Sequence, residues 1–201
     1  MNIRAADKSD FKILADIHVK AFDDFFLTSL GVGFMRAYYK ASLQNRDSIA
    51  FCATDEDGEI IGFSSGCAQA AGFHKRLLTD NFFLFLNQAI ILLFTRPKAI
   101  IHLARNLDKN GNPTDDGRYA ELLSIAVLPE SKGSGVGKAL INAFEVEAQS
   151  RGCKKISLTT DYTGNQVVLS FYKNAGYEVF YEFTTYPHRK MYKLIKNISV
   201  Q

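Results

Sequence analysis

Apolar and polar positions along the chain follow two different periods, and the changes of period divide it into helices and strands. Apolar residues recur at helical spacing over about 11–22 and 32–43. Two apolar runs, 48–54 and 59–66, then predict the strands of a hairpin, because an acidic, glycine-containing turn at 55–58 lies between them. The first half therefore predicts two helices followed by a β-hairpin.

The second half alternates more regularly between strand and helix. Its pattern predicts, in order, a strand over 118–128, a helix over 138–151, a strand over 155–160, a short helix over 166–175, and a hairpin of 177–185 with 189–194. A short strand over 2–5 precedes all of these elements. Strands and helices in this order predict an α/β (α+β) fold over 1–201, with one mixed sheet and helices on both faces.

The connection over about 71–117 is unusually long and helical in pattern. Its most apolar run, 82–94, would span only about 20 Å as a helix, against about 30 Å of membrane hydrocarbon, so we expect no transmembrane span. We favour a place in the core for residues 82–93. A surface for a homodimer, or a cover for a bulky or lipid-like acceptor, stays open as an alternative.

Composition and charge change this picture little. The chain is 47% hydrophobic and 22% charged, as in ordinary globular proteins, and its net charge of +3 is too small to predict a nucleic-acid partner. Its three cysteines are far apart, which predicts neither a disulfide framework nor a metal site. Reduced thiols and an N-terminus without an apolar leader favour a cytoplasmic protein.

A glycine-rich turn between the strand at 118–128 and the following helix carries the clearest chemistry. It reads Lys132-Gly133-Ser134-Gly135-Val136-Gly137-Lys138. The free amides of a helix N-terminus attract phosphate, glycines let the backbone approach it closely, and lysines add charge. The spacing of the turn matches neither a Walker loop nor a dinucleotide fingerprint. It therefore predicts a phosphate cradle of another kind.

Two segments resemble motifs of the GCN5-related N-acetyltransferase (GNAT) superfamily. Residues 119–138 resemble its coenzyme-binding signature, Arg/Gln-x-x-Gly-x-Gly/Ala: Gly135 and Gly137 match the two small positions, and Lys132 stands where Arg or Gln is usual. Residues 165–177 resemble the later family motif, with Val168 in place of the usual alanine. The resemblance implies a mostly antiparallel twisted sheet of the acyl-CoA N-acyltransferase type.

The resemblance also implies acetyl-CoA as the donor co-substrate, without a metal. The turn amides would hold the coenzyme pyrophosphate, the strand backbone before the turn would pair with the pantetheine arm, and an asparagine would orient the coenzyme. The cofactor-binding residues implied in this way are Ile125, Ala126, Val127, Lys132, Gly133, Ser134, Gly135, Val136, Gly137, Lys138 and Asn165.

Two residues are candidates for the proton transfers of acetylation. Tyr172 stands where many family members have the tyrosine beside the coenzyme sulfur, which implies a general acid; the alternative is a core aromatic. Glu121 is the candidate base. Regular alternation would place it on the face of Ile125 and Val127, where desolvation would make it a stronger base. A surface charge, with ordered water as the base, is the alternative.

The acceptor would be the primary amine of a small molecule or peptide. The resemblance makes the acidic and aromatic run 23–26, Asp-Asp-Phe-Phe, a candidate wall of the acceptor pocket; a solvated loop is an equal alternative. Two other functions stay open. One is a coenzyme-binding regulatory or interaction module without catalysis, and the other is an acyltransferase that uses a longer acyl-CoA.

Overall fold

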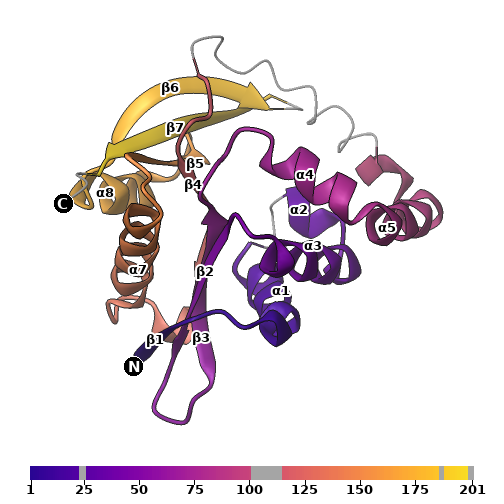
Figure 1. Cartoon of the computed structure of the whole chain (residues 1–201), viewed down its shortest axis with the longest axis horizontal. Coiled ribbons are helices and arrows are strands. Elements are labelled where there is room, and N and C mark those ends of the chain that lie inside the picture. Colours follow the sequence, from indigo (N-terminus) through magenta and orange to yellow (C-terminus); the bar gives the residue numbers. More distant parts are fainter. Residues whose placement is uncertain (23–25, 101–114, 186–187, 199–201) are drawn as a thin grey trace.

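A seven-stranded sheet runs through the middle of the molecule (Figure 1). The computed structural model describes residues 1–22, 26–100, 115–185 and 188–198, and the side chain of Phe26 is outside the description. In the described part the strands are β1 (Asn2–Ala5), β2 (Ser48–Thr54), β3 (Ile60–Cys67), β4 (Ala120–Val127), β5 (Lys155–Asp161), β6 (Glu178–Thr185) and β7 (Arg189–Asn197). Their order is β1-β2-β3-β4-β5-β7-β6, and β4–β5 is the parallel pair among antiparallel ones. The prediction of a single mixed, mostly antiparallel sheet is confirmed.

Helices cover both faces of this sheet, as the sequence predicted (Figure 1). On one face lie α1 (Phe11–Ala21), α2 (Phe26–Ser29) and α3 (Val32–Gln44), with α4 (Phe73–Asp80) and α5 (Phe82–Thr95) farther out; on the other lie α7 (Val136–Ser150) and α8 (Gln166–Asn174). Short 3-10 turns, η1 (Lys8–Asp10) and η2 (Pro129–Ser131), precede α1 and α7. The core is accordingly divided into clusters on either side of the sheet.

Glycines in β3 allow α7 to pack closely on the sheet. A Cβ atom at Gly66 would collide with the carbonyl oxygen of Glu121 and lie 2.8 Å from the ring of Phe144 on α7. At Gly62 it would lie 2.8 Å from the carbonyl oxygen of Ala126. Both positions require the absence of a side chain, because the neighbouring backbone cannot move away cheaply.

A β-bulge interrupts β4 next to Gly66. Ser65 of β3 pairs with Ser124 and Gly66 pairs with Leu122, so Leu123 is the extra residue. The two parts of β4 therefore follow opposite alternations: Leu122 and Ile125, three residues apart, pack in the same cluster on the α7 side. Glu121 thus lies on the face opposite Ile125 and Val127. The regular alternation assumed from the sequence is wrong at this point.

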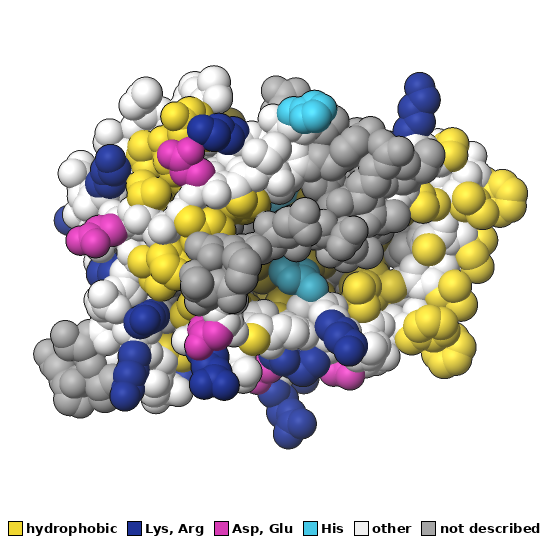
Figure 2. Space-filling view, turned by 90° about the horizontal axis from the view of Figure 1, so that it is seen from above, with side chains coloured by type: hydrophobic (Ala, Val, Ile, Leu, Met, Phe, Trp, Pro, Cys, Tyr) yellow, Lys and Arg dark blue, Asp and Glu magenta, His cyan; other side chains and the backbone are white. Residues whose placement is uncertain are grey.

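The apolar segment 82–93 lies mostly outside the core. Phe85 and Leu92 are buried, but Phe83 and Phe94 are 82% exposed, and apolar side chains gather at the right-hand end of Figure 2, over α5. The expectation of a core segment is therefore wrong for most of its length. No single helix among the described residues is long and apolar enough to cross a membrane. Helices α4 and α5 reach that length and apolar composition only when taken together, and the chain bends by 89° between them.

Candidate active site

Strands β4 and β5 pair at their beginnings and then separate. Their ladder joins residues 120–122 to residues 156–158, after which β4 pairs with β3 alone and β5 with β7 alone among the described strands. Residues 123–127 of β4 and 159–161 of β5 thus no longer pair with each other, and we call the opening between them the β4–β5 split. Backbone groups that face the split can pair with an extended ligand, as a sheet edge does.

The direction of the β4 backbone in this split follows from one hydrogen bond. The amide of Leu128 donates to the carbonyl oxygen of Ile61 on β3 at 2.9 Å. Since successive residues of a strand direct their amide and carbonyl groups to opposite sides, those of Ile125 and Val127 point away from β3 and into the split. These are two of the three residues for which the sequence predicted contact with pantetheine.

The glycine-rich turn forms an open cradle at the start of α7. Gly133 and Gly135 have φ values of 83° and 86°, which few residues other than glycine adopt, and a Cβ atom at either would meet nothing within 4 Å. Gly135 is the N-cap residue and supplies no side chain to the first-turn amides of α7. Ser134 donates its hydroxyl to the carbonyl oxygen of Ser131 at 2.6 Å, which stabilises the turn.

Free amides, a helix N-terminus and two exposed lysines, Lys132 and Lys138, make a donor set that fits a diphosphate. Val136 is instead buried against the sheet, so its side chain anchors the turn while its amide stays at the helix end. The residues of the turn therefore have the chemistry to hold the pyrophosphate of coenzyme A. Within the described residues, no group of three or more His, Cys, Asp and Glu side chains could hold a metal ion.

The turn, the split and α8 converge. A Cβ atom on Gly137 would lie 3.7 Å from the ring of Phe171 on α8 and 4.0 Å from a methyl group of Val127 at the end of β4. Two sequence motifs separated by a strand and a helix are thus brought side by side. A ligand on the turn amides can continue directly along the free edge of β4.

Tyr172, the predicted general acid, packs in the core on the α8 side. Its side chain is 7% exposed and makes edge contacts with Phe171 and Tyr177. Burial raises the pKa of Tyr172 to about 12, so the phenol stays protonated at neutral pH. None of the described residues hydrogen-bonds its hydroxyl group, which leaves the proton available for donation.

Asn165 precedes α8 without capping it. Its side-chain amide donates to the hydroxyl of Thr160 at 2.5 Å and to the carbonyl oxygen of Asp161 at 3.3 Å. Both acceptors lie at the end of β5, on the far side of the split from β4. The carbonyl oxygen of the side chain remains as an acceptor for a ligand in the split.

Glu121, the predicted base, forms an ion pair. Its carboxylate lies 2.5 Å from the ammonium of Lys193 on β7, which is 6% exposed. The ammonium also lies 5.1 Å from the ring centroid of Tyr119. Glu121 is therefore held by a cation on the α1–α3 face of the sheet, in place of the apolar surroundings that the sequence predicted.

Beside this pair is a second polar group that sequence reasoning missed. Asp115 accepts hydrogen bonds from the hydroxyls of Tyr119 at 2.8 Å and Tyr181 at 2.6 Å. Burial alone would raise the pKa of Asp115, but these bonds and one from the amide of Gly117 outweigh it and lower the pKa. We call Asp115, Tyr119, Glu121, Tyr181 and Lys193 the polar cluster. Its members come from distant segments, and only the strand register brings them together.

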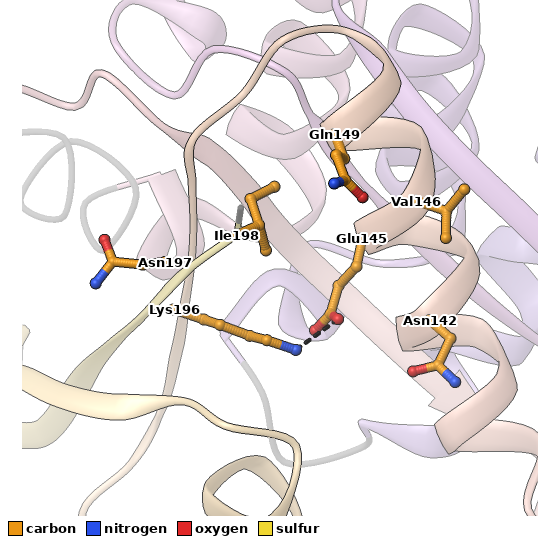
Figure 3. Close-up of a pocket in the computed structure, with 7 residues that line it drawn as sticks. All are labelled: Asn142, Glu145, Val146, Gln149, Lys196, Asn197 and Ile198. Atoms are coloured by element: carbon orange, nitrogen blue, oxygen red, sulfur yellow. Dashed lines mark hydrogen bonds and ion pairs between the residues drawn. The ribbon is translucent and has the colours of Figure 1, made fainter. Parts of the chain in front are cut away.

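Of the acidic and aromatic run 23–26, residues 23–25 lie outside the described residues. A cavity of about 430 Å³ lies between α7 and the end of β7, where Lys196 points toward Glu145 at 2.6 Å (Figure 3). It begins near Asn142, roughly 9 Å along the axis of α7 from Val136, and it contains none of the predicted site residues.

Comparison with known proteins identifies the family. Residues 16–177 match the acetyltransferase (GNAT) family model, and this match covers most of the chain. The chain therefore belongs to the GNAT acetyltransferase family, which uses acetyl-CoA as co-substrate. The resemblance drawn from the two sequence motifs is confirmed.

Solved structures show the same fold at low sequence identity. An aminoglycoside 6'-acetyltransferase type Ii is 18% identical with a TM-score of 0.63, covering 100% of this chain and 99% of that one. The ribosomal-protein-S18-alanine N-acetyltransferase from Escherichia coli is 14% identical with a TM-score of 0.62, covering 100% and 95%. A spermidine N-acetyltransferase chimera from Vibrio cholerae is 14% identical with a TM-score of 0.60, covering 98% and 96%. The fold is thus of the acyl-CoA N-acyltransferase type.

Proposed function

We propose that the protein transfers acetyl from acetyl-CoA directly to the primary amine of a small molecule or peptide. The convergence of the glycine-rich turn with the free edge of β4 is the observation that carries this proposal. The pyrophosphate binds the amides of residues 133–138, and the pantetheine arm pairs with the backbone of Ile125 and Val127. In this proposal the thioester extends along the split toward the start of β4, where Glu121 lies, and Tyr172 acts from the α8 side.

The reaction forms one carbon–nitrogen bond and breaks the carbon–sulfur bond of the thioester. The neutral amine attacks the carbonyl carbon, and a β4 amide near Val127 stabilises the oxyanion of the tetrahedral intermediate. As the thiolate leaves, Tyr172 donates the proton that yields free coenzyme A, and the nitrogen of the new amide returns its extra proton to the tyrosinate, directly or through solvent. The raised pKa of Tyr172 is compatible with this role only in that the phenol is protonated at neutral pH, so the proton is present when the thiolate leaves.

The base that removes the ammonium proton is Glu121 in this proposal. The ion pair with Lys193 fixes the direction of the carboxylate. Asp115 adds a second carboxylate to the polar cluster, which therefore contains two acidic side chains and one ammonium group, that of Lys193. This charge balance favours an acceptor that arrives as a cation.

The acceptor is left as a chemical class, because the similar structures act on unlike amines. Their names specify an aminoglycoside, an alanine of ribosomal protein S18, and spermidine. A screen of aminosugars, polyamines, amino acids and peptides for coenzyme A release, with mass spectrometry of the product, tests the proposal. If the protein binds the coenzyme but releases no thiol with any amine tested, a regulatory module is supported. If coenzyme A is released faster from longer acyl-CoA thioesters than from acetyl-CoA, an acyltransferase that uses a longer acyl donor is supported. The cytoplasmic location stays a prediction.

A further inference from the structure

Helix α5 exposes seven large apolar side chains on one side, with the polar Asn87 among them. The exposed members, which we call the apolar ridge, are Phe82, Phe83, Leu86, Ile90, Ile91, Leu93 and Phe94. They are between 42% and 82% exposed and gather at one end of the molecule (Figure 2). A surface of this kind marks a site of interaction, because scattered single residues would not form a continuous ridge.

The ridge covers half of the helix. At about 100° per residue, its members extend over roughly 180° of the circumference of α5. The opposite side holds the helix on the protein: Phe85 and Leu92 are buried, and the ring of Phe85 lies 5.9 Å from that of Phe34 on α3. Arg96, just after the helix, also donates to the carbonyl oxygen of Ser29 at 2.6 Å. Helix α5 is therefore a fixed, convex apolar projection.

Basic residues flank α5 in the sequence. Between residues 73 and 100 the chain has four basic residues, Lys75, Arg76, Arg96 and Lys98, and one acidic residue, Asp80. Arg76 pairs with Asp47 at 2.9 Å, whereas Lys75 and Lys98 are exposed and form no ion pair with a described residue. An apolar ridge with basic residues at its margins has the charge that complements an anionic lipid surface.

We propose that the apolar ridge inserts into the interfacial layer of an anionic bilayer, with α5 lying in the membrane plane. A helix of 14 residues is about 21 Å long, too short to cross about 30 Å of hydrocarbon. The bend of 89° between α4 and α5 also separates their axes. Acyl chains fit around a convex half-cylinder, whereas a flat protein partner would cover only part of it. Lys75 and Lys98 then contact the anionic headgroups.

Vesicle flotation of the full chain tests this proposal. Vesicles of phosphatidylcholine alone are compared with vesicles that also contain phosphatidylglycerol, at low and high salt. We expect binding to the anionic vesicles, weakened by salt. Replacing Phe83→Asp and Phe94→Asp together should lower the partition coefficient about 100-fold, because two phenylalanine rings no longer enter the bilayer. Val146→Asp is the matched control, since Val146 is equally an exposed apolar residue of a helix, on α7.

Charge variants separate the electrostatic contribution. Lys75→Gln with Lys98→Gln should weaken binding to anionic vesicles by about 30-fold. Lys154→Gln with Lys155→Gln, also exposed, should leave it unchanged. Equal thermal unfolding and coenzyme affinity show that each variant is folded. The proposal would be overturned if the wild type does not bind vesicles, or if ridge and control variants lose binding equally. If the wild type forms dimers, binds no vesicles, and the Phe83→Asp, Phe94→Asp variant is monomeric, the ridge is a contact with a second copy.

Discussion

Replacing Gly135 with alanine separates the effect of backbone strain from the loss of the phosphate cradle. Gly135 has a φ of 86°, and a Cβ atom there would meet nothing within 4 Å. The cost to folding is therefore conformational alone, about 1–2 kcal/mol for an L-residue in this region. Gly58, in the turn between β2 and β3, has the same φ of 86° and the same open surroundings. Gly58→Ala is thus a matched control for strain.

Coenzyme binding should distinguish the two variants. The added methyl group at residue 135 lies where the diphosphate approaches the first-turn amides of α7. Loss of one charge-assisted hydrogen bond, at about 1.5–3 kcal/mol, weakens affinity roughly 10- to 100-fold. Gly58→Ala should bind the coenzyme as the wild type does.

Isothermal titration with coenzyme A, paired with urea unfolding of each variant, measures both quantities. We expect similar losses of unfolding free energy and a loss of affinity for Gly135→Ala alone. If both variants keep wild-type affinity, the turn does not hold the pyrophosphate. If both lose affinity equally, strain alone weakens binding and the cradle is refuted.

Three further predictions concern the catalytic acid, a buried histidine and the glycine beneath the bulge. Tyr172→Phe should lower turnover about 100-fold or more with coenzyme affinity unchanged; unaltered thiol release would remove Tyr172 from the mechanism. Burial lowers the pKa of His18 to about 4, from about 6.5 in an unfolded chain. Neutral His18 therefore contributes stability that is fully present above pH 6.5 and is lost as the pH falls toward 4. About 2 kcal/mol of unfolding free energy should disappear between about pH 7 and 4.5. If a His18→Gln variant shows the same pH profile, His18 is not the cause of this loss. Gly66→Ala should destabilise the fold by about 3 kcal/mol in urea unfolding, because its methyl group meets backbone and the ring of Phe144; full stability would show that β4 can shift.

The arrangement of the sheet could be predicted from the sequence because its signals are local. Apolar periods and turn residues mark each strand and helix, and their order restricts the topology. The glycine-rich turn of the candidate donor site is predictable for the same reason. Residues 132–138 are contiguous, and the amides at a helix N-terminus are free whatever the surroundings.

The bulge could not be predicted, and it changes the position of Glu121. An extra residue in a strand leaves no mark in apolar alternation when its neighbours, Leu122 and Leu123, are both apolar. Gly66 is the partner that permits the bulge, but a glycine in a strand is also compatible with simple close packing. The face on which Glu121 lies, and its partner Lys193, depend on tertiary register alone.

The exposure of α5 to solvent also could not be predicted from the sequence. An apolar run of this length is equally suited to a core helix and to a membrane-facing one, because periodicity reports which residues are apolar and not what covers them. Here Phe85 and Leu92 are the residues of α5 that are buried against the protein, and Phe85 packs on α3. The other large apolar residues of α5 are left exposed.

The two halves of the site differ in what kind of group forms them, and this difference explains why the donor is easier to assign than the acceptor. The proposed donor half consists of backbone amides of β4 and α7, which any sequence supplies once the split and the glycines are present. The acceptor half is built from side chains such as Asp115, Tyr181 and Lys193, which reach one another from separate strands. Side chains can change without altering the fold, and the structures that are 14–18% identical to this chain have its fold while their names specify unlike amines. The acceptor must therefore be sought through the polar cluster, where two carboxylates and one ammonium favour a cationic amine.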